Sequence, residues 1–332
     1  MPPVPSFRSS GDLRADRRYE YARAAFDDGD HSAAADLARQ VLELAPGFPA
    51  AHALLARALI ALGEDEAAVA PLEQALALEP DDALGVRIDL ARLGRVPPDA
   101  AITAGYVRAL FDDYAPHFER HLVKNLLYRG PELLADALRR AASKRFRPFR
   151  FRRAFDLGCG TGLMAEALAG VCQAIEGVDL SPRMLAKAAK TRRYAQLHER
   201  DLVGFLAALP TAEADLVTAA DVFVYVADLA PVFRHTGRIL GRDGFLAFTV
   251  QAHATEGAIL GDDARYSHGE NYLRAELAAA GLEVVLFEEV STRLDRGEPV
   301  PGYLVVAEPM PPPAPRGAAP TRSSPGPTDR SR

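Results

Sequence analysis

The chain has 332 residues, of which 48% are hydrophobic and 25% are charged, with a formal net charge of −6 and a pI near 5.8. This length predicts a globular protein of more than one domain, and the acidic balance argues against a nucleic-acid partner, which calls for a basic surface. Two cysteines are too few for a disulfide framework, and the sequence has neither a signal peptide nor an apolar run of roughly 18 residues, so we expect a cytoplasmic protein without membrane contact.

The first part of the chain repeats itself. Shifting the sequence by 34 residues places Gly29 on Gly63 and Pro46 on Pro80, and several alanine and leucine positions coincide as well. A period of this length is typical of tetratricopeptide repeats, in which pairs of antiparallel helices stack on one another. We therefore expect an α-helical tetratricopeptide-repeat region over 12–97, after a disordered N-terminus over 1–11.

This repeat array is short. A third hairpin is incomplete, because one helix over 83–93 is followed by Pro97 and Pro98, which interrupt what comes next. About three repeats are normally needed for a stable core, so the array should lean on the rest of the chain or on a partner. Two roles remain open at this point: a docking groove for a protein or a carrier, and a stabilising helical cap.

Residues 98–150 are expected to form a helical segment followed by a linker. Apolar side chains at spacings of four, among them Tyr114 and Phe118, indicate that 98–144 is helical. The basic run over 144–153 interleaves arginine with phenylalanine, a pattern that can bind RNA, but it directly precedes a strand. We interpret this run as a solvated linker.

The stretch from Phe155 to Gly162 reads as a buried strand that runs into a glycine turn and then a helix. Glycine at every second position lets the backbone adopt positive φ and lets a ligand approach without a Cβ in the way. The helix that follows presents free N–H groups at its start. The next strand, 174–178, ends in Asp179, where doubly wound folds hold a nucleotide ribose. A dinucleotide fingerprint would require glycine at the position of Leu163, so the spacing argues against NAD.

Strands and helices alternate beyond this point, which predicts a mainly parallel sheet with helices on both faces over 151–308. The expected strands lie at 195–198, 215–219 and 245–250, and the expected helices at 202–209, 229–240 and 272–280. A closing pair of strands follows at 283–289 and 303–307. Proline, serine and arginine dominate 309–332, which we expect to be a disordered tail.

These motifs resemble a known family. Asp156-x-Gly158-x-Gly160-x-Gly162, followed by Asp179-Leu180-Ser181-Pro182-x-Met184, is similar to the first two motifs of class I S-adenosylmethionine-dependent methyltransferases. The stretches 106–118, 265–268 and 297–302 resemble predicted methyltransferases that carry N-terminal tetratricopeptide repeats. The resemblance implies a doubly wound, mainly parallel seven-stranded sheet, and S-adenosyl-L-methionine as the cofactor.

The resemblance also implies roles for individual residues. Asp156 and the three glycines would contact the methionine end, and Asp179 would bind both ribose hydroxyls. In this family the helical part of 98–150 covers the cofactor as a lid, and Tyr114 would then lie near the sulfonium or the adenosine. The adenine would be bound by Leu180 and Met184 and, through its amino group, by the Asp201-Leu202 pair. Leu180 and Met184 could instead be helix core, Tyr114 could be ordinary core, and Asp201 could be a helix N-cap.

The end of the fourth strand carries Ala220 and Asp221, at the edge where ligands gather in such sheets. The sequence there lacks the Asn/Asp-Pro-Pro-Tyr/Phe pattern, which makes DNA adenine and protein glutamine poor substrates. We place Asp221 and His268 as candidate catalytic residues, the latter because it follows the fifth strand, where this class has substrate loops. The sequence shows no set of ligands with zinc spacing, so we expect no metal.

Three functions fit this pattern. The leading hypothesis is methyl transfer to a small-molecule or carrier-bound metabolite. The alternatives are a protein methyltransferase whose substrate docks on the repeats, and a repeat-based interaction module whose second domain binds the cofactor without catalysis.

Overall fold

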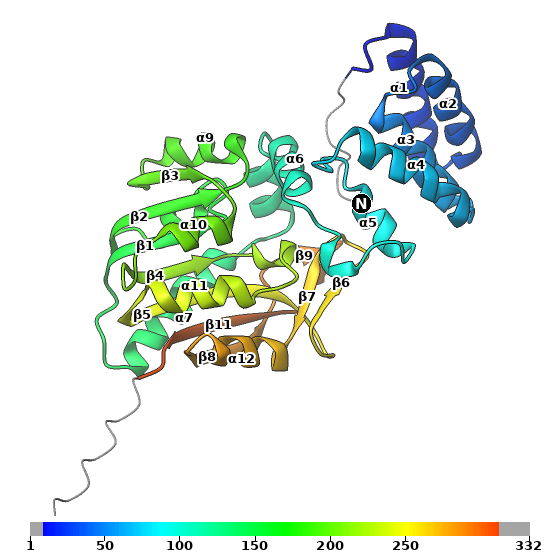
Figure 1. Cartoon of the computed structure of the whole chain (residues 1–332). Helices are drawn as coiled ribbons and strands as arrows, with labels where there is room; N and C mark the ends of the chain where they lie inside the picture. Colours follow the sequence, from blue (N-terminus) through cyan, green and yellow to red (C-terminus); the bar gives the residue numbers. More distant parts are fainter. Residues whose placement is uncertain (1–8, 312–332) are drawn as a thin grey trace, which may run out of the picture.

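The computed structural model describes residues 9–311, and the terminal segments for which we expect disorder lie largely outside this range. The first helices form the repeat region, which lies beside the α/β domain at the upper right of Figure 1. Their bounds are α1 (Leu13–Asp27), α2 (His31–Leu44), α3 (Pro49–Ala61), α4 (Asp65–Leu78) and α5 (Val86–Arg92). Helices α2 and α4 both end two residues before the prolines of the 34-residue repeat, as the repeat predicts.

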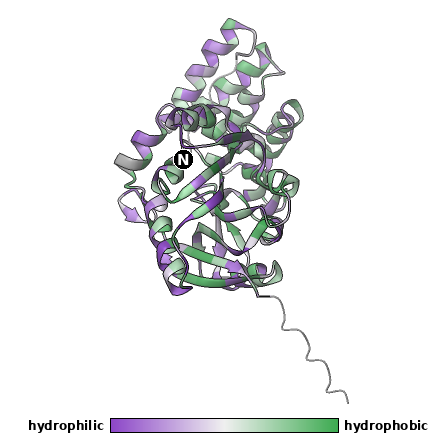
Figure 2. Ribbon diagram, turned by 90° about the vertical axis from the view of Figure 1, so that its left-hand side faces the viewer, coloured by the Kyte–Doolittle hydropathy of each residue, from purple (hydrophilic) through white to green (hydrophobic). Residues whose placement is uncertain are grey.

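Alanines let the repeat helices pack closely. Ala34, Ala38, Ala56 and Ala68 are fully buried between neighbouring helices, together with Leu72. Figure 2 shows the repeat helices at the top with alternating hydrophobic and hydrophilic stretches, as expected of helices that bury one side. The third hairpin is incomplete, because α5 is followed by a short 3₁₀ helix at Pro98–Ala100.

The segment 98–144, which the spacing predicts to be helical, is divided into shorter helical elements. It contains α6 (Ala104–Tyr114), a π-helical turn (Arg120–Asn125) and α7 (Gly130–Lys144). Pro116 and Pro131 lack the backbone N–H that a continuous helix needs, and Pro131 occupies the first turn of α7, where proline is tolerated.

The α/β domain contains the expected seven-stranded sheet, in the order β3-β2-β1-β4-β5-β11-β8. Strands β1 to β5 pair in parallel, and β11 lies antiparallel between β5 and β8. The bounds are β1 (Phe151–Leu157), β2 (Cys172–Asp179), β3 (Gln196–Glu199), β4 (Ala214–Ala219), β5 (Leu240–His253), β8 (Leu282–Val290) and β11 (Gly302–Pro309). The predicted doubly wound, mainly parallel sheet is therefore confirmed.

Two small additions were not predicted. Strands β6 (Ala258–Leu260) and β7 (Tyr266–Gly269) form a hairpin, and β7 pairs in parallel with the end of β5. Strands β9 (Leu294–Asp295) and β10 (Glu298–Pro299) form a separate short hairpin. Both follow strands whose carboxyl ends lie at the same edge of the sheet, so both add structure at that edge.

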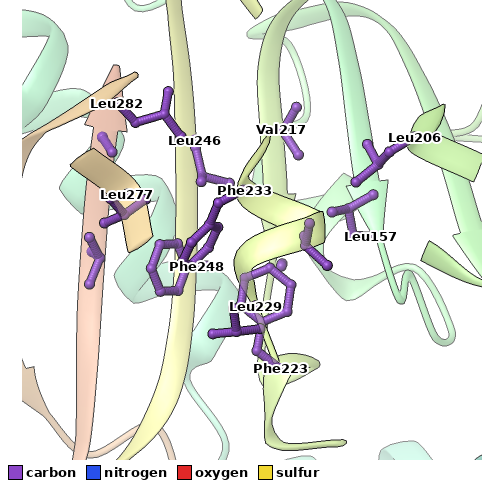
Figure 3. Packing of buried hydrophobic residues seen from close by; sticks show 14 of the residues in the cluster. Leu157, Leu206, Val217, Phe223, Leu229, Phe233, Leu246, Phe248, Leu277 and Leu282 are labelled. Carbon is purple, nitrogen blue, oxygen red and sulfur yellow. The ribbon is translucent and has the colours of Figure 1, made fainter. Parts of the chain in front are cut away.

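Helices cover both faces of the sheet. On one face, α10 (Leu202–Ala208), α11 (Ala230–Ile239) and α12 (Glu270–Ala279) bury a core in which Phe233 packs on Phe248 with ring centroids 5.3 Å apart (Figure 3). On the other face, α7 and α8 (Leu163–Ala167) pack on a second core. Helix α9 (Pro182–Thr191) follows β2. No helix among the described residues is both long enough and apolar enough to span a bilayer.

The basic run after α7 forms ion pairs and is not simply a solvated linker. Arg145 and Arg147 both pair with the buried carboxylate of Glu308, and the Arg147 contact is 2.7 Å long. Arg153 contacts Glu176 at 2.7 Å. These arginines tie the entry to β1 to the last strand and to β2.

The repeat region rests on the α/β domain through α6 and the β6–β7 hairpin. Ile88 and Ala91 of α5 form one buried cluster with Tyr106 and Leu110 of α6 and with Ala264. Arg92 donates a hydrogen bond of 2.8 Å to the carbonyl of Asp262. The array therefore packs against the rest of the chain, which is one of the two ways in which so short an array can be stabilised.

We predict that Gly105→Ala loosens this junction. A Cβ on Gly105 would overlap the carbonyl oxygen of Asp81, which precedes α5, so the substitution should cost about 1–3 kcal/mol and lower the melting temperature by several degrees. Gly47→Ala is the matched control, because a Cβ there meets no atom within 4 Å. Equal melting temperatures for the two variants, measured by calorimetry, would show that the junction does not bear on stability.

Candidate functional site

The glycine turn after β1 adopts the backbone that the motif predicts. Gly158, Gly160 and Gly162 have φ values of 60°, 52° and 102°. A Cβ on Gly158 would collide with the side chain of Val222, whereas a Cβ on Gly160 would meet only the Phe118 ring, at 3.9 Å. Gly162 then starts α8. The missing side chain at Gly160 thus leaves a space between the turn and the segment that follows α6.

Asp179 lies at this turn. Its Oδ2 accepts a hydrogen bond of 2.9 Å from the amide of Gly160, and its Oδ1 accepts one of 2.9 Å from the amide of Ser181. Burial raises the pKa of this carboxyl, and the backbone N–H groups oppose the rise. Ser181 caps α9, as predicted, by accepting from the amide of Met184 at 3.0 Å. The structure therefore brings the glycine motif and the predicted ribose carboxylate together.

Asp156 is only 2% exposed, and the protein itself satisfies both of its oxygens. The hydroxyl of Thr218 donates to Oδ1 at 2.9 Å, and the hydroxyl of Tyr194 donates to Oδ2 at 2.6 Å. Burial raises the pKa of this carboxyl to about 6. In this structure the Asp156 carboxylate links β1 to β4 and to the residue segment that precedes β3.

Helix α6 and the segment after it cover the turn as a lid. Asp112 accepts a hydrogen bond of 2.6 Å from the hydroxyl of Ser181, and Arg108 donates to the carbonyl of Leu180 at 3.2 Å. The rings of Phe111, Tyr114, Phe118 and Tyr225 form an aromatic cluster, with neighbouring centroids 5.1 to 6.2 Å apart. Tyr114 lies in this cluster, its hydroxyl bonds to Nδ1 of His121, and burial raises its pKa to about 12.

The residues predicted to contact adenine differ in how exposed they are and in the local role that each has. Leu180, which directly follows β2, and Leu202, the first residue of α10, are both half-buried. Asp201 is exposed and caps α10 by accepting from the amide of Gly204 at 2.7 Å, which is the alternative role that the sequence left open. Met184 is 0% exposed and packs as helix core, so it presents no surface to a ligand here.

Asp221 follows Ala220 at the carboxyl end of β4, in a left-handed conformation with φ 55°. Its Oδ1 accepts from Thr249 at 2.8 Å, while Oδ2 accepts from Thr292 at 2.7 Å and from Arg293 at 3.2 Å. Thr292 and Arg293 belong to the loop after β8, and no local sequence pattern indicates that this loop reaches β4. Asp221 is thus held in an ion pair at the predicted ligand edge.

His268 is not at this site. The segment around it is strand β7 instead of a loop, which turns the imidazole inward, and the side chain is 0% exposed. Its Nε2 donates to the carbonyl of Val226 at 3.0 Å, and the ring stacks on Tyr272. Burial lowers the pKa of His268 to about 4. His268 therefore stabilises the loop after β4 through this hydrogen bond, and its burial argues against a role for His268 as a catalytic base.

A hollow of about 250 Å³ lies beside the start of α8, lined by Tyr128, Pro131, Glu132, Leu163, Glu166 and Ala167. Its lining comes from the start of α7 and from the residues next to Gly162. The sequence analysis did not single out Tyr128. Within residues 9–311, no group of three or more His, Cys, Asp or Glu side chains is arranged to hold a metal ion.

Comparison with protein families matches residues 155–248 to a methyltransferase domain and residues 25–88 to the tetratricopeptide repeat. Among curated proteins, the chain is similar to the ubiquinone biosynthesis O-methyltransferases of Thiobacillus denitrificans, 34% identical over 107 residues, and Paracidovorax citrulli, 30% identical over 113 residues. Each match covers 31% of this chain, and 45% and 44% of the two relatives. The chain thus spans less than half the length of these relatives.

Two solved methyltransferase structures align with about three fifths of this chain. The magnesium protoporphyrin IX methyltransferase of Synechocystis PCC 6803 with bound SAH covers 62% of this chain and 99% of its own, with a TM-score of 0.48 and 16% identity. An S-adenosylmethionine-dependent methyltransferase from Clostridium acetobutylicum covers 60% and 99%, with a TM-score of 0.46 and 16% identity.

We predict that His268 makes stability depend on pH. Its pKa is about 4 in the folded protein and near the ordinary 6.5 when unfolded, so the unfolded chain takes up the proton first. Stability should be complete above pH 6.5 and fall toward pH 4, by on the order of 3 kcal/mol from this residue. His268→Gln keeps an N–H donor but does not titrate, so its melting temperature should fall less than that of the parent between pH 7 and pH 5.

The control is His235→Gln, which changes a partly exposed histidine on α11. An identical pH profile for the parent and the His268 variant would contradict the burial argument.

Proposed function

We propose that this chain, which joins a tetratricopeptide-repeat region to a class I S-adenosylmethionine-dependent methyltransferase domain, transfers a methyl group to a small-molecule or carrier-bound metabolite. One observation carries the proposal. The carboxylate of Asp179 and the amide of Gly160 meet at 2.9 Å, at the carboxyl edge of a parallel sheet and under a lid. This is the arrangement that holds a nucleoside at the edge of a doubly wound fold.

The residues at the turn fit the cofactor. Each oxygen of Asp179 accepts one backbone hydrogen bond and keeps a lone pair for a ribose hydroxyl. The three glycines and the hollow beside α8 would accept the methionine end, with Asp156 at the end of the strand that leads into the turn. Leu180, Asp201 and Leu202 would border the adenine, and Ala220 the sulfonium side.

The cofactor supplies a methyl carbon on a sulfonium; the bond to the acceptor forms as the carbon–sulfur bond breaks and its electron pair goes to sulfur. The chain mainly holds the partners in register, which can supply about 7–11 kcal/mol of the barrier. The aromatic cluster, with Tyr114 and Phe118 in it, excludes water and presents ring faces to a cation, an attraction of about 0.5–2 kcal/mol.

Asp221 is the residue we propose to orient the acceptor and take its proton. Its Oδ1 accepts one hydrogen bond, from Thr249, and retains a lone pair. The names of the two curated relatives favour oxygen as the acceptor atom. The repeats favour a second candidate, methylation of a docked protein, because such arrays present concave binding surfaces.

We expect Asp179→Ala to weaken S-adenosylmethionine binding. Hydrogen bonds to a charged group contribute about 1.5–3 kcal/mol each, so losing both should raise Kd by two or more decades. Calorimetric titration measures this, with the melting temperature as a check on folding. Glu289→Ala, which removes an exposed carboxylate on β8 at the opposite edge of the sheet from β3, should leave Kd unchanged. Equal affinities for the parent and the Asp179 variant would remove the ribose role.

We expect the full chain to transfer labelled methyl from S-adenosylmethionine into the small-molecule fraction of a cell extract. Label in the protein fraction would instead favour the docked-protein candidate. Tight cofactor binding without label in either fraction would contradict the proposed catalysis.

A further inference from the structure

Arg293 carries a buried donor that the protein does not use. The side chain is only 6% exposed, and its Nη1 pairs with Asp221 at 3.2 Å. Its Nη2 is buried and has no hydrogen-bond partner within the part of the chain that the structure describes. Burying an unmatched polar group costs about 1–3 kcal/mol, and more when it is charged, so such a donor calls for an explanation.

The charges around Arg293 show where its side chain lies. Arg293 opposes the burial-driven rise in the pKa of Tyr114 in the lid and in that of Tyr128 beside the hollow. The backbone next to Arg293 lies against the start of α7, because the amide of Arg129 donates to the carbonyl of Thr292 at 2.8 Å. The guanidinium therefore lies beside Asp221 at the end of β4, close to the residues that precede α7.

A second unmatched atom lies at the same edge. Gln251 follows Thr249 by two residues on β5, so both side chains are on one face of the sheet. The amide nitrogen of Gln251 donates to Asp263 at 3.1 Å, whereas its Oε1 is buried without a partner among the described residues. Arg265 contacts the same Asp263 at 3.4 Å, and it also acts on the pKa of Tyr114.

We infer that the methyl acceptor is an organic acid whose carboxylate binds Nη2 of Arg293 and stays ionised while another atom is methylated. This rests on the proposed function and names its substrate class. Arginine is suited to the task, because it remains charged when buried and its donors match a carboxylate. A carboxylate held by a charged donor is a poorer nucleophile, so the methyl group goes elsewhere. The free Oε1 of Gln251 is available to a hydroxyl of the same acid.

The charge of the product tests the inference. The full chain is incubated with extract and tritiated S-adenosylmethionine, and the labelled small molecules are applied to an anion exchanger at pH 7. The label should be retained, and should stay retained after phosphatase treatment and after mild base. Release by phosphatase would identify a phosphate, and release by base a methyl ester; either would overturn the carboxylate assignment.

The experiment distinguishes failure of this inference from failure of the proposed function. Unreacted S-adenosylmethionine is cationic and passes through the exchanger, so an incubation without the protein gives the background. Unretained label above that background would overturn the organic acid while leaving methyl transfer intact. No labelled small molecule at all would defeat the proposed function itself, and this inference with it.

Arg293→Met should raise KM for the retained acceptor by about tenfold or more, the equivalent of 1.4 kcal/mol, with unchanged affinity for S-adenosylmethionine. Arg293→Lys is the second variant in case the first does not fold. Lysine keeps a positive charge beside Asp221, but it lacks the planar guanidinium whose two terminal nitrogens can donate to Asp221 and to the acceptor carboxylate at once. KM should therefore also rise. Arg296→Met, at an exposed arginine on the same hairpin, is the matched control.

The cofactor itself has a carboxylate, and a last comparison separates it from the acceptor. If Arg293→Met weakens binding of S-adenosylmethionine but not of 5′-methylthioadenosine, which lacks that carboxylate, then Arg293 belongs to the cofactor and the inference is wrong. Unchanged binding of both ligands together with a raised KM supports it.

Discussion

The hydrogen bond from the amide of Gly160 to the carboxylate of Asp179 depends on how closely β1 and β2 approach each other. Asp156 lies opposite Gly177 in this parallel pair, and a Cβ on Gly177 would come within 2.8 Å of the sulfur of Cys159. With glycine at 177, the turn after β1 can lie against the end of β2. The position of the turn then fixes where α8 starts, where Asp179 points and which surface the lid covers. A bulkier residue at one point in β2 would thus displace several elements at once.

Three carboxylates, Asp156, Asp179 and Asp221, gather at the carboxyl edge of the sheet, and each is stabilised in a different way. Hydroxyl groups bond to the first, backbone amides to the second and a guanidinium to the third. Only the third has a full positive charge beside it. The first two therefore leave a negative field in a poorly hydrated space, and such a field attracts a cationic ligand.

Much of this arrangement could be predicted from local sequence. The glycine spacing, Ser181 as a cap and the alternation of strands with helices are short-range patterns, so the turn, α9 and the order of the elements followed from them. Contacts between distant segments could not be predicted in the same way. Nothing near Arg293 indicates that the loop after β8 folds back on β4, and the motif around His268 does not reveal that it becomes a strand paired with β5. The breaks within the helical segment 98–144 have a local cause in its prolines, but the apolar spacing alone does not show where these breaks fall.

Helix α6 contacts both the repeat region and the α/β domain. Its first turn and its apolar face pack against the repeat region, and Asp112 near its end is bonded to Ser181 at the start of α9. If α6 has two positions, and the repeats and the turn each bind their ligands more tightly in one of them, the two binding events are coupled. By thermodynamic reciprocity, each ligand then changes the affinity for the other by the same factor. Helix α6 is a direct physical link between the repeats and the turn.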